Sequence, residues 1–143
     1  MTDAAALLAT TPLVARRGPF ALAAWAPAQV SAVCQGLLRC RTAHGLVVLD
    51  EREASALLPE HALLDMPPAR HVQRGWSLIT LDQPMEWNVT GILAAVSTAL
   101  AQAGIPLGAA AAFSRDHLFV PSERLDDALS ALRPLCAEVR VLA

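Results

Sequence analysis

The second half of the chain carries an ordered series of structural patterns that few folds can accommodate. Residues 76–82 form a short apolar run that contains Ile79 and Thr80 and ends in turn residues, which predicts a strand. Apolar residues then recur at helical spacing, with Asn88 as the expected N-cap and Gly104 as the stop. The apolar residues of this stripe are Val89, Ile92, Leu93, Val96 and Leu100. A strand followed by an amphipathic helix is therefore expected.

The remainder of this half predicts a hairpin, a second helix and a last strand. Small apolar residues at 105–113, a turn at 114–116 and a returning strand at 117–120 predict the hairpin. Ser122 is the expected cap of the next helix, which has acidic early turns and ends near Pro134. Residues 138–142 alternate polar and apolar, as a strand does. The order strand, helix, strand, strand, helix, strand is the split βαβ arrangement of the ferredoxin-like fold, in which two helices cover one face of a sheet.

The first half predicts a similar but weaker series. Residues 20–25 predict a strand, 37–42 and 46–50 a hairpin, and 51–58 a short helix. Because only residues 27–33 separate the first two strands, the first helix is expected to be eroded.

We therefore expect an α+β fold of two tandem ferredoxin-like βαββαβ modules, the first of them degenerate. The expected modules are residues 1–72 and 73–143, and a chain of 143 residues has room for two compact domains. Pro67-Pro68 and the polar stretch 70–75 form the expected junction, although the last strand of the first module could also lie there.

The basic residues exclude several function classes. All 11 of them are arginine and they are scattered along the chain, whereas a nucleic-acid partner would require a basic stripe. Without lysine there is no Schiff-base nucleophile and no P-loop lysine, and no serine lies in a Gly-x-Ser-x-Gly elbow. We expect no nucleic-acid partner and no enzymatic activity.

The N-terminal segment and the cysteines bear on location and cofactors. Arg16 and Arg17 follow the first apolar run, the reverse of a secretion signal, and no apolar run reaches the roughly 20 residues of a membrane span. Cys34, Cys40 and His44 match no common zinc spacing. The expectation is a cytoplasmic protein without membrane contact, metal or other cofactor.

Three stretches of the second half form a recognisable pattern: residues 76–96, 100–105 and 116–120, with a Thr-Gly-Ile helix entry at 90–92 and Asp116 near the hairpin. This pattern resembles the small tandem ACT-domain proteins related to the CASTOR-type amino-acid sensors. The first half resembles the family more loosely, through Arg41-Thr42 and the strand after that pair.

The resemblance implies a non-catalytic regulatory or sensing module. Such ACT domains pair, within a chain or between chains, and hold a small ligand, usually an amino acid, at their interface. The expected partner of the chain is a further copy of itself in a homo-oligomer. The unpaired N–H groups at a helix start suit a ligand carboxylate, while Asp116 or Glu86 suits its ammonium group. The site residues implied by the resemblance are Glu86, Asn88, Val89, Thr90, Gly91, Ile92, Phe113 and Asp116.

Two alanines make the sequence depart from that family. Ala111 and Ala112 stand where relatives usually carry a Ser-Thr pair, which leaves a different ligand, a more apolar ligand or no ligand as alternatives. The second hypothesis is a structural or interaction module that has lost ligand binding. Gly91 then serves close packing and Asp116 serves its own turn. Trp87 is the tryptophan best placed to wall a pocket.

Overall fold

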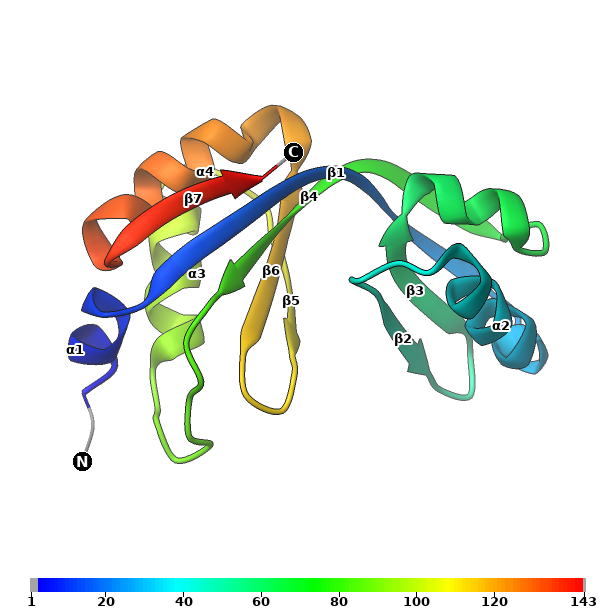
Figure 1. Ribbon diagram of the computed structural model, residues 1–143, viewed down its shortest axis with the longest axis horizontal. Helices are drawn as coiled ribbons and strands as arrows, with labels where there is room; N and C mark the ends of the chain where they lie inside the picture. Colours follow the sequence, from blue (N-terminus) through cyan, green and yellow to red (C-terminus); the bar gives the residue numbers. More distant parts are fainter. Residues whose placement is uncertain (1–2, 143) are drawn as a thin grey trace. The chain divides into compact units, whose positions relative to one another are not determined.

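The computed structural model describes residues 3–142, which fold into two compact units (Figure 1). We call Gly18–Trp76 the central unit, and the described residues up to Arg17 together with those from Ser77 onward the terminal unit. Strands β1 (Pro12–Trp25) and β4 (His71–Leu81) each run from one unit into the other. The compact units therefore do not coincide with a division at 72/73, because the start of the chain groups with its end.

The terminal unit contains the expected order of strand, helix, strand, strand, helix and strand. After β4 its elements are α3 (Ile92–Gln102), β5 (Gly108–Ala111), β6 (Asp116–Pro121), η3 (Ser122–Arg124), α4 (Leu125–Leu132), η4 (Arg133–Leu135) and β7 (Glu138–Leu142). The sheet runs β7-β1-β4-β6-β5. The first part of β1 lies parallel to β7, with Pro12 opposite Glu138, and the short helix α1 (Ala4–Ala9) precedes it. The sequence patterns assigned no element to this part of β1.

The core of the terminal unit explains why α3 and α4 form. Val96 and Leu100 of α3 and Leu125 and Leu132 of α4 are fully buried against Ile79 and other apolar residues of the sheet. These positions recur at helical spacing, so each helix buries one apolar stripe. The apolar pattern alone was enough to predict both helices.

Both expected helix caps are wrong. Asn88 lies outside α3, which begins after Gly91, a residue in the left-handed region with φ of 94°. The chain reverses at Gly91 because glycine tolerates this backbone conformation, and no side chain caps the helix. The hydroxyl of Ser122 forms a hydrogen bond of 2.8 Å with that of Ser77 in β4 and does not cap α4.

The central unit has the same order of elements, with a 3-10 segment in place of the second helix. Between the two long strands it contains η1 (Pro27–Gln29), α2 (Val30–Cys40), β2 (Leu46–Leu49), β3 (Ala54–Pro59) and η2 (Glu60–Asp65). The sheet order is β2-β3-β1-β4, and β3 pairs antiparallel with β1 from Phe20 opposite Pro59 to Trp25 opposite Ala54. The last strand of this unit is the first part of β4, which the sequence had left as an alternative for the junction.

The expected strand at 37–42 and the expected loss of the first helix are both wrong. Residues 37–40 belong to α2, where Val33, Leu37 and Cys40 share one face and contact the core around Trp25. The composition of this stretch is also compatible with a strand. Burial favours the helix, because only a helix places the side chains of Val33, Leu37 and Cys40 together on the core.

The expected helix at 51–58 is also wrong, because the segment forms a turn followed by β3. Asp50 Oδ1 accepts hydrogen bonds from the backbone N–H of Arg52 at 2.7 Å and of Glu53 at 2.9 Å. The same aspartate could cap a helix, so the local pattern is ambiguous. Pairing of β3 with both β1 and β2 decides in favour of the strand.

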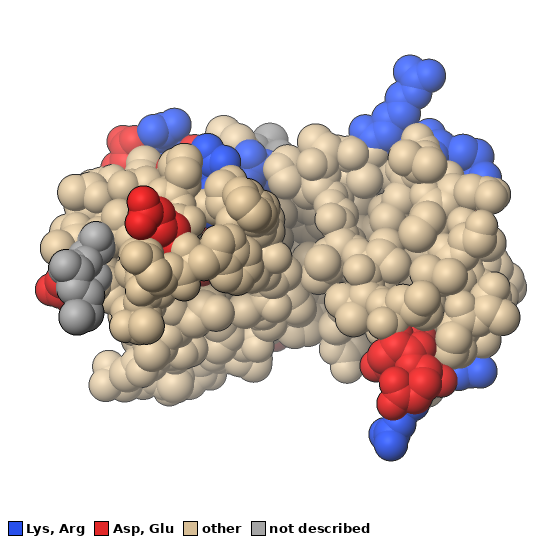
Figure 2. Space-filling view, turned by 90° about the horizontal axis from the view of Figure 1, so that it is seen from below, with Lys and Arg blue, Asp and Glu red and all other residues tan. Residues whose placement is uncertain are grey.

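Surface features add little to this picture. On the face shown in Figure 2, uncharged residues cover most of the surface, and the arginine and acidic side chains lie mainly near its edges. None of the helices in the described part of the chain has the length and apolar character required to span a membrane.

Candidate functional site: a pocket at the start of helix α3

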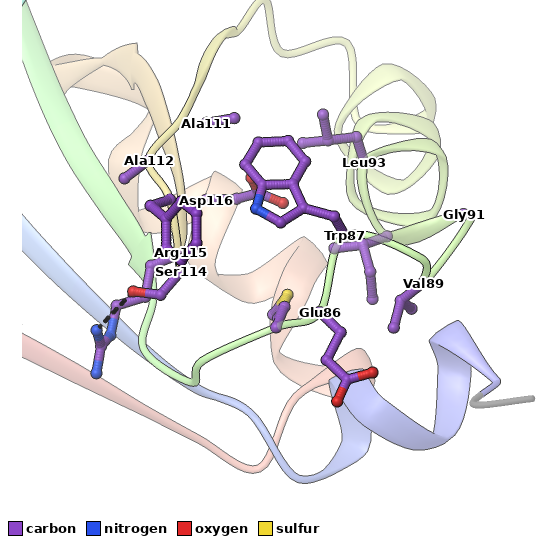
Figure 3. A pocket seen from close by; sticks show the side chains of 13 residues that line it. Glu86, Trp87, Val89, Gly91, Leu93, Ala111, Ala112, Ser114, Arg115 and Asp116 are labelled. Atoms are coloured by element: carbon purple, nitrogen blue, oxygen red, sulfur yellow. Dashed lines mark hydrogen bonds between the residues drawn. The ribbon is translucent and has the colours of Figure 1, made fainter.

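A pocket of about 240 Å³ lies in the terminal unit, between the start of α3 and the β5–β6 hairpin (Figure 3). Three segments line it: the loop between β4 and α3, the first residues of α3, and the hairpin turn. The lining residues are Met85, Glu86, Trp87, Val89, Gly91, Ile92, Leu93, Ala111, Ala112, Phe113, Ser114, Arg115 and Asp116. Eight of them are apolar side chains, so most of the wall is hydrophobic.

Hydrogen bonds attach the loop to the hairpin and so fix the mouth of the pocket. The backbone N–H of Met85 donates to the carbonyl of Ser114 at 2.9 Å. At the base of the loop, Arg115 Nε donates to Asp82 Oδ1 at 2.9 Å, and Arg115 Nη1 donates to Ser114 Oγ at 3.3 Å. The N–H of Ala112 donates to the Arg115 carbonyl at 2.9 Å and closes the hairpin. Loop and hairpin therefore form one connected wall.

The opposite wall is the N-terminus of α3. Ala95 N–H donates to the Gly91 carbonyl at 3.0 Å, so the N–H groups of residues 92–94 have no partner within the helix. Ile92 is buried in the core and anchors this end of the helix. Unpaired N–H groups and the positive end of the helix dipole favour an anion such as a carboxylate near this wall.

Asp116 supplies a carboxylate on the hairpin side of the pocket. It is the first residue of β6 and pairs with Ala111 of β5. Burial raises the pKa of the Asp116 carboxyl, and the neighbouring His117 opposes part of that shift. Within residues 3–142, no hydrogen bond or ion pair to the Asp116 carboxylate is found. The fold thus holds an unpartnered carboxylate, partly removed from water, at the pocket.

His117 follows Asp116 in β6, so its side chain lies on the opposite face of the strand and contacts other residues. Its Nδ1 lies 2.9 Å from Thr80 Oγ1, within hydrogen-bond distance. Burial lowers the pKa of the His117 imidazole, the positive charges of Arg16 and Arg115 lower it further, and Asp116 raises it. His117 does not line the pocket.

The structure gathers most of the implied site residues. Glu86, Val89, Gly91, Ile92, Phe113 and Asp116 all line the pocket, whereas Asn88 and Thr90 are exposed and outside its lining. In Figure 3 the Glu86 carboxylate extends away from the hairpin, while Asp116 lies behind the Trp87 ring. The lining residues absent from the implied set are Met85, Trp87, Leu93, Ala111, Ala112, Ser114 and Arg115.

The missed residues have identifiable sequence signals. Trp87 had been singled out as a pocket wall, and Ala111 and Ala112 as the altered pair of the family pattern. Leu93 had been assigned to the apolar stripe of the helix, but its side chain is 42% exposed and borders the pocket. Leu93 borders the pocket because it lies in the first turn of α3. The sequence alone did not show where that turn begins.

Comparison with known proteins supports the fold. Residues 71–134 match a family model described as an ACT domain. No curated protein matches the chain significantly. The family model covers less than half of the chain, and solved structures match over more of its length.

Three solved structures illustrate what the whole chain is similar to. A protein from Agrobacterium tumefaciens has a TM-score of 0.75 and 21% identity, over 94% of this chain and 95% of that one. A Vibrio cholerae protein of unknown function, described as a possible transport protein, has a TM-score of 0.69 and 22% identity, over 92% and 94%.

The third is the ligand-free regulatory subunit of aspartate kinase from Thermus thermophilus, with a TM-score of 0.68 and 15% identity, over 90% and 98%. At these identities the likeness concerns the fold. The α+β fold of ferredoxin-like ACT modules, expected from the sequence, is confirmed.

Proposed function

We propose that the protein is a non-catalytic regulatory module that senses a small ligand, an amino acid, bound in the pocket at the start of α3. The observation that carries the proposal is the pairing of an unpartnered carboxylate with a helix N-terminus across one pocket. Asp116 complements an ammonium group, and the open N–H groups of α3 complement a carboxylate. An α-amino acid carries both groups on neighbouring atoms.

The comparisons supply the regulatory part of this proposal. The ACT-domain match covers the pocket residues, and one similar structure is a regulatory subunit of aspartate kinase. We also propose that the protein is related to the CASTOR-type amino-acid sensors. We further place the protein in the cytoplasm, and we place the ligand between paired ACT modules. A second copy of the chain is the proposed partner, because Trp87 and Phe113 leave large apolar surfaces exposed at the pocket rim.

The non-catalytic assignment rests on the comparisons, in which one similar structure is a regulatory subunit of aspartate kinase. Within the described residues, no group of three histidine, cysteine or acidic side chains is arranged to hold a metal ion. His117 and Asp116 are adjacent in sequence, but His117 contacts Thr80 and does not line the pocket. Ser114 and Asp116 both line the pocket, but within the described residues no hydrogen bond joins the Ser114 hydroxyl to a carboxylate, and its oxygen accepts from Arg115 Nη1.

A thermal-unfolding screen against the twenty amino acids tests the proposal. A ligand at one hundred times its Kd is expected to stabilise the protein by about 2.7 kcal/mol, a shift of several degrees in Tm. Asp116→Ala should remove most of this shift, whereas Asp65→Ala, an exposed aspartate of the central unit, should leave it unchanged. If none of the twenty shifts Tm, the sensing function is rejected.

The two alanines favour a second candidate function. Ala111 and Ala112 place no hydrogen-bonding group on the hairpin wall, as expected of a pocket that no longer holds a polar ligand. In that case the module serves association alone. Light scattering separates the candidates: an oligomer that is insensitive to all twenty amino acids supports the association module.

A further inference from the structure

Among the described residues that line the pocket, Arg115 is the only arginine, and it is already paired with a carboxylate. Arg115 Nε donates to Asp82 Oδ1, and its Nη1 donates to the Ser114 hydroxyl. In Figure 3 its guanidinium extends away from the Trp87 ring. A ligand side chain that carries a second carboxylate would therefore meet no free cationic partner on the described lining, and would lie near Asp116 and Glu86.

A second cationic group is no better accommodated. Asp116 is needed for the ligand ammonium, and the Glu86 carboxylate extends away from the hairpin side (Figure 3). The hydroxyl oxygen of Ser114 accepts a hydrogen bond from Arg115, and one neutral hydroxyl does not replace the hydration of a second ligand cation. Polar and charged ligand side chains would thus lose their hydration without gaining partners, which costs affinity.

The remaining surface of the pocket is apolar and exposed. Phe113 is 87% exposed and Trp87 is 68% exposed, although both are large rings that proteins usually cover. Leu93 is 42% exposed beside them. In Figure 3 the Trp87 indole lies between the alanines of the hairpin and Leu93 of α3. An apolar ligand side chain placed here would remove ring surface from water on several sides.

On the basis of the proposed function, we infer that the pocket selects α-amino acids with an apolar side chain, of the branched aliphatic or aromatic class. Asp116 receives the ammonium group, the start of α3 receives the carboxylate, and Trp87, Leu93 and Phe113 contact the side chain. Ala111 and Ala112 then have a positive role, because a methyl wall accepts the apolar side chain where hydroxyls would remain unpaired.

Calorimetric titration of the full chain with matched probes tests this selectivity. The probes are L-leucine, L-phenylalanine, L-glutamate, L-lysine and 4-methylpentanoate, which is leucine without its amino group. Leucine or phenylalanine should bind at least tenfold more tightly than glutamate and lysine. Loss of the amino group should cost at least another tenfold, because Asp116 is then left unpaired.

Variants separate the side-chain contacts from the backbone contacts of the ligand. Trp87→Ala should weaken leucine or phenylalanine about tenfold, and Asp116→Asn should remove the preference for leucine over 4-methylpentanoate. Leu64→Ala, which truncates an 88% exposed leucine of the central unit, is the matched control and should change neither affinity.

Three outcomes contradict the inference, and they are distinguishable. If glutamate or lysine binds more tightly than the apolar amino acids and Asp116→Asn weakens it, the selectivity is wrong while the sensing function stands. If none of the twenty amino acids binds, the sensing function fails and the inference fails with it. Binding of leucine that Trp87→Ala leaves unchanged would also contradict the assigned contacts.

Discussion

The terminal and central units complete the same order of elements with different second helices. In the terminal unit this element is α4, which buries Leu125, Ala128, Leu129 and Leu132. In the central unit it is the 3-10 segment η2, in which Ala62 is the buried residue. A 3-10 turn cannot present a long apolar stripe, so η2 covers less of its sheet than α4 does.

The central unit compensates for this thin element with one large ring. Trp25 is fully buried at the centre of a small core that includes Val33, Leu58 and Ala62. Its Nε1 donates to the Pro67 carbonyl at 2.8 Å, so its polar atom is also satisfied. The comparison shows that a ferredoxin-like module tolerates a reduced helix when a single residue fills the space and fixes the chain that follows it.

The largest expected effect concerns this dependence on Trp25. Trp25→Ala should lower the free energy of unfolding by about 3–5 kcal/mol, because it opens a cavity and leaves the Pro67 carbonyl without its donor. Chemical denaturation followed by circular dichroism measures the loss. Trp87→Ala is the control, since its ring is mostly exposed and its removal should change stability by no more than about 0.5 kcal/mol. Equal losses of unfolding free energy in the two variants would contradict the role assigned to Trp25.

A smaller loss of stability is expected when one glycine of each unit is replaced by alanine. Gly18 of the central unit and Gly91 of the terminal unit both have positive φ, of 80° and 94°. A Cβ on Gly18 would lie 2.6 Å from the Phe20 backbone nitrogen, whereas on Gly91 it would lie 3.5 Å from the Ala4 Cβ. Gly91→Ala should therefore cost about 1–2 kcal/mol from backbone strain alone, and Gly18→Ala about 1–3 kcal/mol more from the clash.

The same denaturation experiment measures both variants. Gly45→Ala is the control, because Gly45 has no positive φ and a Cβ there would make ordinary van der Waals contacts. A cost for Gly91→Ala as large as that for Gly18→Ala would mean that the start of α3 is more tightly constrained than its surroundings indicate.

The smallest effect is the pH dependence that Asp116 gives the terminal unit. The pKa of Asp116 is raised in the folded state, so the folded protein binds more protons than the unfolded chain at pH values between the two pKa values. Stability contributed by this group therefore falls as the pH rises from about 3.9, the ordinary pKa of aspartate, through the folded pKa. Asp116→Asn should be slightly more stable than wild type at pH 7 and indistinguishable near pH 3. Denaturation at both pH values measures this, and a destabilised variant at pH 7 would show that the carboxylate has a favourable partner.

The part of the terminal unit from residue 77 onward could be predicted from sequence, because each of its elements has its own local pattern of apolar or turn residues. The stripe from Ile92 to Leu100 and the hairpin around Ser114 each fix one element without reference to the rest of the chain. The central unit could not be predicted in this way, since residues 37–42 and 51–58 have compositions compatible with either helix or strand. In both segments the partner surfaces decided the outcome.

The candidate site, too, could be predicted from the sequence only in part. The sequence pointed to Gly91, Phe113 and Asp116 through its resemblance to ACT-domain proteins, and all three line the pocket. It misplaced Asn88, because the cap position depends on where the chain reverses, and that is fixed by the φ of Gly91. Leu93 became a pocket residue only through the orientation of the first turn of α3.

By itself the sequence determined the ferredoxin-like order of the elements from residue 76 onward and the absence of lysine chemistry, and its resemblance to ACT-domain proteins implied six of the residues that line the pocket. Only the tertiary structure decided that β1 lies beside β7, that residues 30–40 are helical, and that the Asp116 carboxylate lies partly buried without a partner. The physical reason is that periodicity and turn chemistry act over a few neighbouring residues. Burial, strand pairing and the desolvation of a charge depend on residues far apart in the chain.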